Sequence, residues 1–204
     1  MDVTQYIHII GLLMYLTNAR PDIFFVVNTL SQYLVQPGRV HLIAAKHVMR
    51  YLKGTIEFGL YYEGNHDYIL YGYTYADWAG SVSDRKNTSS GCFFLGFGMI
   101  SWFSKKQSNI SISTTEAEYI ATFSASCEAI WLRKLMSGLF NLELDTTVIL
   151  CDNQSCIKMT ENSVFHDRSK HIEIWYFYIR YKMQMMMFQY SHTEDIDDVS
   201  VFPY

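Results

Sequence analysis

The sequence predicts a mixed α/β fold, in which helices pack on one sheet, preceded by a small helical segment. Three observations support this prediction. Apolar residues recur at helical spacing up to about residue 64. The stretch 68–113 is rich in aromatic and β-branched residues interrupted by short turns, and helix-like and strand-like segments alternate after it. This order favours a mixed sheet covered by helices.

The composition is that of a folded protein. The chain has 204 residues, of which 50% are hydrophobic and 18% are charged, and its formal net charge is −4. These values exclude a disordered protein, which needs low hydrophobicity and high net charge. A negative net charge also provides no bulk attraction to nucleic acid, so any such binding must depend on local basic clusters.

The cysteines and the N-terminus predict an intracellular protein that is neither secreted nor embedded in a membrane. No cysteine spacing matches a zinc site or a C-x-x-C pair, so we expect reduced thiols. No basic segment precedes the apolar N-terminal stretch, and no apolar run approaches the ~20 residues that span a bilayer. The cysteines are Cys92, Cys127, Cys151 and Cys156.

Three helices are expected in the first part of the chain, because apolar stripes are bounded there by proline and glycine. Their ranges are 9–16, 24–34 between Pro21 and Pro37, and 41–52 before Gly54. The composition changes near residues 64–67. We therefore expect residues 1–64 and 65–204 to be separate domains.

The second part of the chain alternates between strands and helices. Gly96, Phe97 and Gly98 predict a hairpin turn. The segment 113–116 fits a capping box that opens a long helix, and the apolar run 146–151 predicts a buried strand. The other expected strands are 68–75, 91–95, 99–103, 110–113 and 185–190, and the expected helices are 114–139, 153–161, 169–183 and one beginning near 193.

Three carboxylates adjoin these elements in a way that suggests a shared site. Asp77 follows the first strand, Glu116 lies in the first turn of the long helix, and Asp152 follows the buried strand. Such carboxylates can converge, and Mg²⁺ or Mn²⁺ would neutralise their repulsion. Each also has a structural alternative, which is a turn before Gly80, a capping box and a helix N-cap, respectively.

Several motifs occur in the order and spacing of one known family. They are YTYADWAG at 73–80, DRKNTSSG at 84–91, ISWFSKKQ at 100–107, STTEAEY at 113–119, CDNQS at 151–155 and FHDRSKHI at 165–172. With these motifs the chain resembles the ribonuclease H region of copia-type retrotransposon Pol polyproteins. Residues 20–23 and 50–55 resemble the end of the preceding reverse transcriptase, so residues 1–64 would be its thumb-like remnant.

The resemblance implies a ribonuclease H-like fold that cleaves the RNA strand of RNA–DNA hybrids with two Mg²⁺ or Mn²⁺ ions and no small-molecule cofactor. Glu116 and Asp152 would be catalytic metal ligands by motif. Asp198 would be the last ligand if one residue of the family motif is deleted, with Asp195 and Asp197 as alternatives. Other Pol segments, such as the reverse transcriptase palm, would be partners.

The first strand departs from the family motif, which reads Asp-x-Asp-Trp-Ala-Gly. Tyr75 stands where the family has the Asp shared by both ions, and only Asp77 is kept. Residues i and i+2 of a strand face the same side, so Asp77 is the candidate ligand, although it lies roughly 6–7 Å further along. A tyrosine hydroxyl is neutral at pH 7 and a poor ligand for Mg²⁺. We therefore expect weakened metal binding and impaired cleavage.

Local basic and polar residues are the expected contacts to hybrid phosphates and 2′-hydroxyls. An ordinary solvated surface is the alternative for each basic pair. These candidates are Arg85, Lys86, Lys105, Lys106, Asn153, Arg168 and Lys170.

Two other interpretations stay open beside an impaired ribonuclease. The first is a catalytically inactive fold that at most binds nucleic acid. The second is a fragment that folds incompletely, because residues 199–204 end the chain where the family continues with a further helix. Metal affinity separates the ribonuclease from the inactive fold, and a cooperative melt separates both from the fragment.

Overall fold

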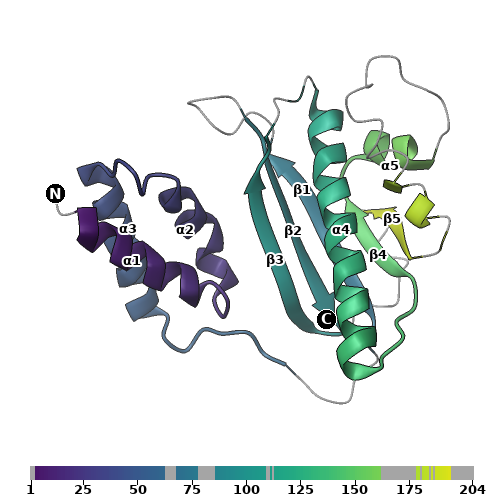
Figure 1. Cartoon of the computed structure of the whole chain (residues 1–204), viewed down its shortest axis with the longest axis horizontal. Helices are drawn as coiled ribbons and strands as arrows, with labels where there is room; N and C mark the ends of the chain where they lie inside the picture. Colours follow the sequence, from purple (N-terminus) through teal and green to yellow (C-terminus); the bar gives the residue numbers. More distant parts are fainter. Residues whose placement is uncertain are drawn as a thin grey trace. The chain divides into compact units, whose positions relative to one another are not determined.

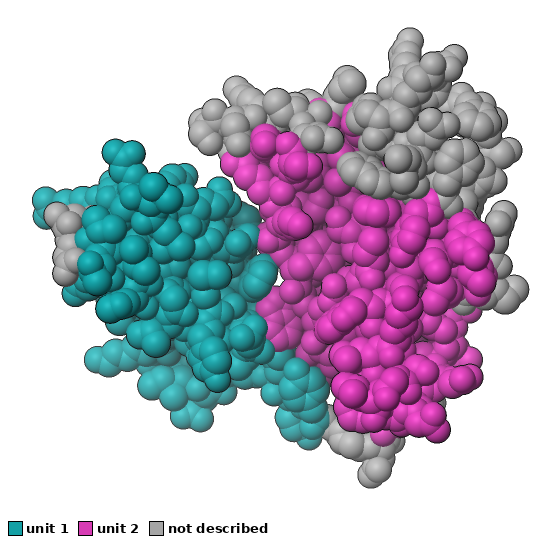
Figure 2. All heavy atoms as spheres, in the orientation of Figure 1, with its two compact units in different colours: residues 1–62 teal, residues 63–204 magenta. Residues whose placement is uncertain are grey.

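The computed structural model divides into two compact units, residues 1–62 and 63–204, each of which is described by itself (Figures 1 and 2). The described residues are 3–62, 68–77, 86–108, 111, 113–161, 178–179, 181–183, 185 and 187–193. Within them, no helix has both the length and the apolar character that a membrane crossing requires.

The first unit contains the expected helices. They are α1 (Val3–Leu16), the short 3₁₀ helix η1 (Pro21–Ile23), α2 (Phe24–Ser31) and α3 (Arg39–Gly54). Buried apolar side chains from α1, α2 and α3 form its core, including Tyr6, whose hydroxyl donates to the Leu30 carbonyl at 2.8 Å. The second helix ends earlier than the expected residue 34, and the third starts earlier than residue 41.

A buried arginine, Arg20, connects two helix ends of the first unit through hydrogen bonds. Arg20 is 7% exposed and donates from Nε and Nη2 to the two carboxylate oxygens of Asp22, at 2.9 and 2.7 Å. Its Nη1 donates to the Thr55 carbonyl at 2.9 Å. The Tyr51 hydroxyl also donates to Asp22. This network therefore joins the start of η1 to the end of α3.

In its described part, the second unit is a five-stranded mixed sheet with helices, which confirms the expected fold class. Its strand order is β3-β2-β1-β4-β5, in which β1, β2 and β3 are antiparallel, whereas β4 runs parallel to β1 and to β5. This strand order agrees with the ribonuclease H-like fold that the sequence resemblance implies. Its elements are β1 (Leu70–Asp77), β2 (Thr88–Leu95), β3 (Gly98–Lys106), α4 (Thr114–Phe140), β4 (Thr147–Cys151), α5 (Gln154–Glu161) and β5 (Phe188–His192).

Some expected elements fall mainly outside the described residues. They are the short strand at 110–113, the helix at 169–183 and the helix beginning near 193. Within the helix at 169–183, residues 178–179 and 181–183 are described and are helical.

Helix α4 lies across one face of the sheet (Figure 1). Its N-cap is Ser113, whose Oγ accepts the backbone N–H of Glu116 at 3.2 Å. Asn141 ends it in the left-handed conformation, with φ of 53°. The small side chains of Ala117 and Ala121 pack with Ala76 of β1, so the helix can approach the end of that strand closely.

A buried amide fixes the start of α4 to the end of the sheet. Gln107 follows β3, and its Oε1 accepts from Asn87 Nδ2 and from Ser111 Oγ, both at 3.0 Å. Its Nε2 donates to Ser89 Oγ at 2.9 Å and to the Ala117 carbonyl at 3.0 Å. One side chain thus ties β2 and β3 to the first turn of α4.

Candidate metal centre

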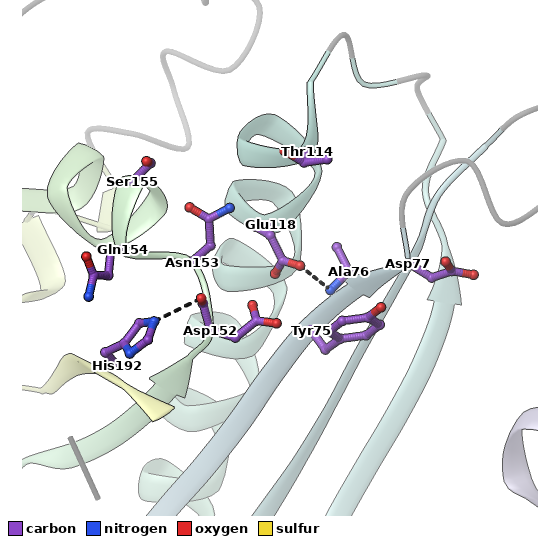
Figure 3. Close-up of a pocket in the computed structure, with 10 residues that line it drawn as sticks. All are labelled: Tyr75, Ala76, Asp77, Thr114, Glu118, Asp152, Asn153, Gln154, Ser155 and His192. Carbon is purple, nitrogen blue, oxygen red and sulfur yellow. Dashed lines mark hydrogen bonds between the residues drawn. The ribbon is translucent and has the colours of Figure 1, made fainter. Parts of the chain in front are cut away.

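The candidate site lies where three elements meet at one edge of the sheet. The parallel strands β1 and β4 end at the same edge, and the first turns of α4 face both strand ends. The resulting pocket is shown in Figure 3. Its lining residues are Tyr75, Ala76, Asp77, Thr114, Glu118, Asp152, Asn153, Gln154, Ser155 and His192.

Glu118 is the most unusual side chain of this pocket, because it is a carboxylate with only 6% of its surface exposed. Its Oε1 accepts the backbone N–H of Ala76 at 3.0 Å. Its Oε2 is buried and has no hydrogen-bond partner among the residues that the structure describes. Burial, with a smaller contribution from the negative charge of Asp152, raises the pKa of Glu118 to about 7, while the Ala76 hydrogen bond acts in the opposite direction.

Glu118 belongs to a cluster that can hold a cation. A carboxylate oxygen of Glu118, Sγ of Cys151 and a carboxylate oxygen of Asp152 all lie within 4.8 Å of one another. Glu118 and Cys151 are buried, whereas Asp152 is exposed. Among the residues that the structure describes, no other group of this kind is found.

The neighbours of Asp152 hold it at the end of β4. His192 Nε2 lies 3.0 Å from the Asp152 carbonyl oxygen. The next residue, Asn153, accepts the Cys156 N–H on its Oδ1 at 2.9 Å and so caps α5. The N-cap alternative for Asp152 is therefore wrong, because Asn153 fills that position and the Asp152 carboxylate turns toward the pocket (Figure 3).

The sequence-predicted carboxylates are only partly brought together. Asp152 is in the cluster. Asp77 lines the pocket, but its side chain points away from Glu118 and Asp152 (Figure 3). Glu116 is not among the lining residues, and its backbone N–H bonds to the Ser113 cap. Asp198 lies outside the described residues, as do its alternatives Asp195 and Asp197.

Sequence reasoning missed Glu118, although the chain contains a signal for it. Glu118 lies four residues before Thr122 and seven before Ala125, on a face of α4 that is entirely buried. A charged residue on such a face is unusual and marks a candidate site.

The expected nucleic-acid contacts are only partly described. Lys105 and Lys106 end β3, where they pair in register with Ser89 and Thr88 of β2. Thr88 is in turn opposite Asp77, so both lysines stand at the same edge of the sheet as the pocket. Lys86 precedes β2 and is half-buried. Arg85, Arg168 and Lys170 lie outside the described residues.

Comparisons with known proteins give close relatives by sequence. Over 199 residues the chain is 39% identical to the retrovirus-related Pol polyprotein from transposon RE1 of Arabidopsis thaliana, covering 98% of this chain and 14% of that protein. Over 181 residues it is 43% identical to the retrovirus-related Pol polyprotein from transposon TNT 1-94 of Nicotiana tabacum, covering 88% of this chain and 14% of that protein. The chain thus spans about one seventh of these relatives.

No family model matches the chain. Among solved structures, LC11-RNase H1, isolated from compost by a metagenomic approach, aligns with 66% of this chain and 92% of its own. The TM-score is 0.46 and the sequence identity is 12%.

Proposed function

Because the chain belongs to the copia-type retrotransposon Pol family, we propose that its second unit is a metal-dependent ribonuclease for RNA–DNA hybrids with impaired cleavage. The first unit would be the thumb-like end of the reverse transcriptase, as its helices and its place before the ribonuclease H-like domain suggest. The alternative is an inactive domain that only binds nucleic acid.

The buried carboxylate Glu118 carries this proposal. Its Oε2 is buried and has no hydrogen-bond partner among the described residues, and a carboxylate oxygen of Glu118 lies within 4.8 Å of one of Asp152. A buried acceptor left in this way is costly unless something binds it. Two carboxylates fit a hard divalent cation, which supports Mg²⁺ or Mn²⁺. Bound in a pair, such ions would stabilise the attacking and leaving oxygens of a phosphodiester.

The residues around the carboxylates would position them and the substrate. The Ala76 N–H holds one oxygen of Glu118, which leaves the other directed to the pocket. His192 lies against the Asp152 backbone. Lys105 and Lys106, at the same sheet edge, would contact the hybrid backbone through its phosphates.

Tyr75 is the reason to expect impaired cleavage. It lines the pocket and is 52% exposed, at the position where the family has its shared Asp ligand. A phenol lacks the negative charge of the carboxylate that it replaces and is a poor ligand for Mg²⁺. Asp77 is two residues further along β1 and its side chain points away from Glu118 and Asp152, so this proposal gives it no ligand role.

The test is cleavage of an end-labelled RNA–DNA hybrid with Mg²⁺ or Mn²⁺. We expect the natural chain to cut weakly or not at all, and Tyr75→Asp to increase the rate. Adding Glu118→Gln to that variant should abolish cleavage. Adding Glu116→Gln, two residues away on the same helix, is the matched control and should retain it.

Other outcomes would overturn parts of this proposal. A natural chain that cuts as fast as Tyr75→Asp would show that Tyr75 does not impair the site. If Glu116→Gln abolishes cleavage and Glu118→Gln does not, Glu116 and not Glu118 is the metal ligand of α4. If neither chain cuts but both bind hybrid and melt cooperatively, the inactive binding domain is the better description.

A further inference from the structure

We propose that the sheet face opposite α4 binds single-stranded nucleic acid, whose bases stack on a row of aromatic side chains that ends at the pocket. This inference goes beyond the proposed function, which concerns the carboxylates and the hybrid backbone, and it needs no metal ion. The aromatic row consists of Tyr71, Tyr73, Tyr75, Phe94 and Trp102.

The alternation of β1 places three tyrosines on this face. Successive side chains of a strand point to opposite faces of the sheet. Ala76 packs against Ala117 and Ala121 of α4, so every second residue of β1 before it faces that helix. These residues are buried, as expected for positions that a helix covers. The remaining positions face the other side and are occupied by Tyr71, Tyr73 and Tyr75.

The two neighbouring strands extend the row on the same face. Phe93 of β2 lies in the hydrophobic core with side chains of α4, so the next residue, Phe94, faces away from the helix. In β3, Ser101 donates to Glu128 of α4 at 2.6 Å, so the next residue, Trp102, also faces away. The aromatic row therefore spans three adjacent strands.

The rings contact one another and keep accessible surface. Tyr71 and Phe94 are stacked, with ring centroids 5.1 Å apart and planes 6° from parallel. Tyr73 meets Phe94 edge-on, with centroids 6.1 Å apart. Tyr75 is exposed and the other four rings are half-buried. Such rings on a sheet surface offer the planar apolar faces on which unpaired bases stack.

Neither α4 nor α5, the long helices of the second unit that the structure describes, covers this part of the sheet. Helix α4 lies on the other face (Figure 1). Helix α5 contacts α4, β4 and β5. Within the described residues, the aromatic row also lies outside the hydrophobic core clusters.

The charges at the end of the row suit a phosphate backbone. Lys106 lies opposite Thr88, which lies opposite Asp77, so Lys106 faces the same side as Tyr75. The preceding residue, Lys105, is exposed at the same sheet edge. A strand whose bases stack along the row would bring phosphates to these lysines. Asp77 opposes this attraction, so Asp77→Asn should strengthen binding.

Tyr75 connects the aromatic row to the pocket, because its ring belongs to the row and also lines the pocket (Figure 3). The family has an Asp at this position. The change from carboxylate to phenol removes a negative charge that would repel phosphates and adds a stacking surface. The substitution that is expected to impair cleavage would therefore favour binding of an unpaired base at the pocket.

The test is fluorescence anisotropy of a labelled single strand of about 12 nucleotides with the full chain and a chelator. We expect Tyr73→Leu and Tyr75→Leu each to weaken binding about tenfold. A strand with abasic sites should bind at least about tenfold more weakly, and Lys106→Gln should reduce the salt dependence of binding. Trp131→Leu is the matched control, because this exposed ring belongs to α4 on the other side of the sheet. Since Tyr75 is exposed, Tyr75→Leu should keep the melting temperature of the natural chain.

Three results would overturn the inference. If the abasic strand binds as tightly as the intact one, phosphate contacts alone hold it. If Tyr75→Leu binds as tightly as Trp131→Leu, the aromatic row is not the site. If the natural chain binds no single strand but forms dimers that Tyr75→Leu separates in sedimentation, a second copy occupies this face. Because the chelator removes metal ions, these results are independent of hybrid cleavage by Tyr75→Asp, which tests the proposed function.

Discussion

The backbone N–H of Ala76 donates to Oε1 of Glu118 at 3.0 Å, which joins the end of β1 to the second turn of α4. This bond fixes the direction of the carboxylate, because Ala76 itself is held against Ala117 and Ala121 of the same helix. One oxygen is occupied by the strand, and the other is left for the pocket. The packing of Ala76 against Ala117 and Ala121 therefore helps to set the direction of the Glu118 carboxylate.

The raised pKa of Glu118 predicts that this residue destabilises the metal-free protein at high pH. The pKa is about 7 in the folded state and near 4.5 in the unfolded chain, so the folded state binds the proton more tightly between these values. The contribution of Glu118 to the free energy of unfolding is therefore greatest below about pH 4.5, and it is lost as the pH rises through 7. With a chelator at pH 8, Glu118→Gln should be more stable than the natural chain by on the order of 2 kcal/mol.

Urea unfolding at pH 5 and pH 8 measures this effect, and the gain should shrink at the lower pH. Glu143→Gln, an exposed residue after α4, is the control. The prediction is wrong if Glu118→Gln and Glu143→Gln change the free energy of unfolding by the same amount at each pH.

Gln107→Leu should destabilise the second unit by at least about 2 kcal/mol, because it removes four buried hydrogen bonds at once. The affected groups belong to Asn87, Ser89, Ser111 and the Ala117 carbonyl. Urea denaturation measures the loss, and Lys105→Gln on the exposed surface of β3 serves as the comparison. Equal stability of the two variants would mean that this network contributes little.

Gly72→Ala should destabilise the sheet by about 1–3 kcal/mol through overpacking. A Cβ at this position would lie 2.5 Å from two ring carbons of Phe93 and 2.9 Å from the Cys92 carbonyl oxygen. In contrast, a Cβ at Gly138 in α4 would meet nothing within 4 Å. Gly138→Ala should therefore stabilise the protein by roughly 0.5–1 kcal/mol. Thermal unfolding should show shifts of opposite sign, and shifts of the same sign would contradict the steric argument.

Arg20→Lys should destabilise the first unit by about 1–2 kcal/mol even though the charge is kept. Lysine cannot reproduce the paired hydrogen bonds to Asp22 or reach Thr55 with the same planar group. The hydrogen bond from Arg20 is also the main cause that lowers the pKa of Asp22. Hydrogen exchange of α3 amides would report the change, with the exposed Arg39→Lys as control. Unchanged protection would argue against the network.

The fold class could be predicted from sequence because its signals are local. Proline and glycine bound the helices of the first unit, and the hairpin at Gly96 and the cap at Ser113 are read directly from the chain. The positive φ of 58° at Gly96 shows why that turn needs glycine. The end of α2 was less predictable, because the apolar pattern continues beyond the last helical residue.

The site was harder to predict, because it depends on which face of a helix meets a strand end. Glu116 and Glu118 are both near the start of α4, and the motif alone does not separate them. Only the contact with Ala76 places Glu118 in the pocket. Likewise, Asp152 and Asn153 both suit an N-cap, and the geometry assigns the cap to Asn153. Cys151 carries no spacing signal, since its neighbours in the cluster come from the adjacent residue and from a distant helix.

The parallel pairing of β1 with β4 has a consequence for folding kinetics. Its partners Tyr71 and Val148 are 77 positions apart, whereas β2 and β3 pair across the turn at Gly96. Closing the longer loop costs more chain entropy, and contacts distant in sequence slow folding. We expect the antiparallel strands to assemble early and the β1–β4 pairing late. During synthesis, a partly made chain would then have most of its sheet before it had any capacity to hold a metal ion.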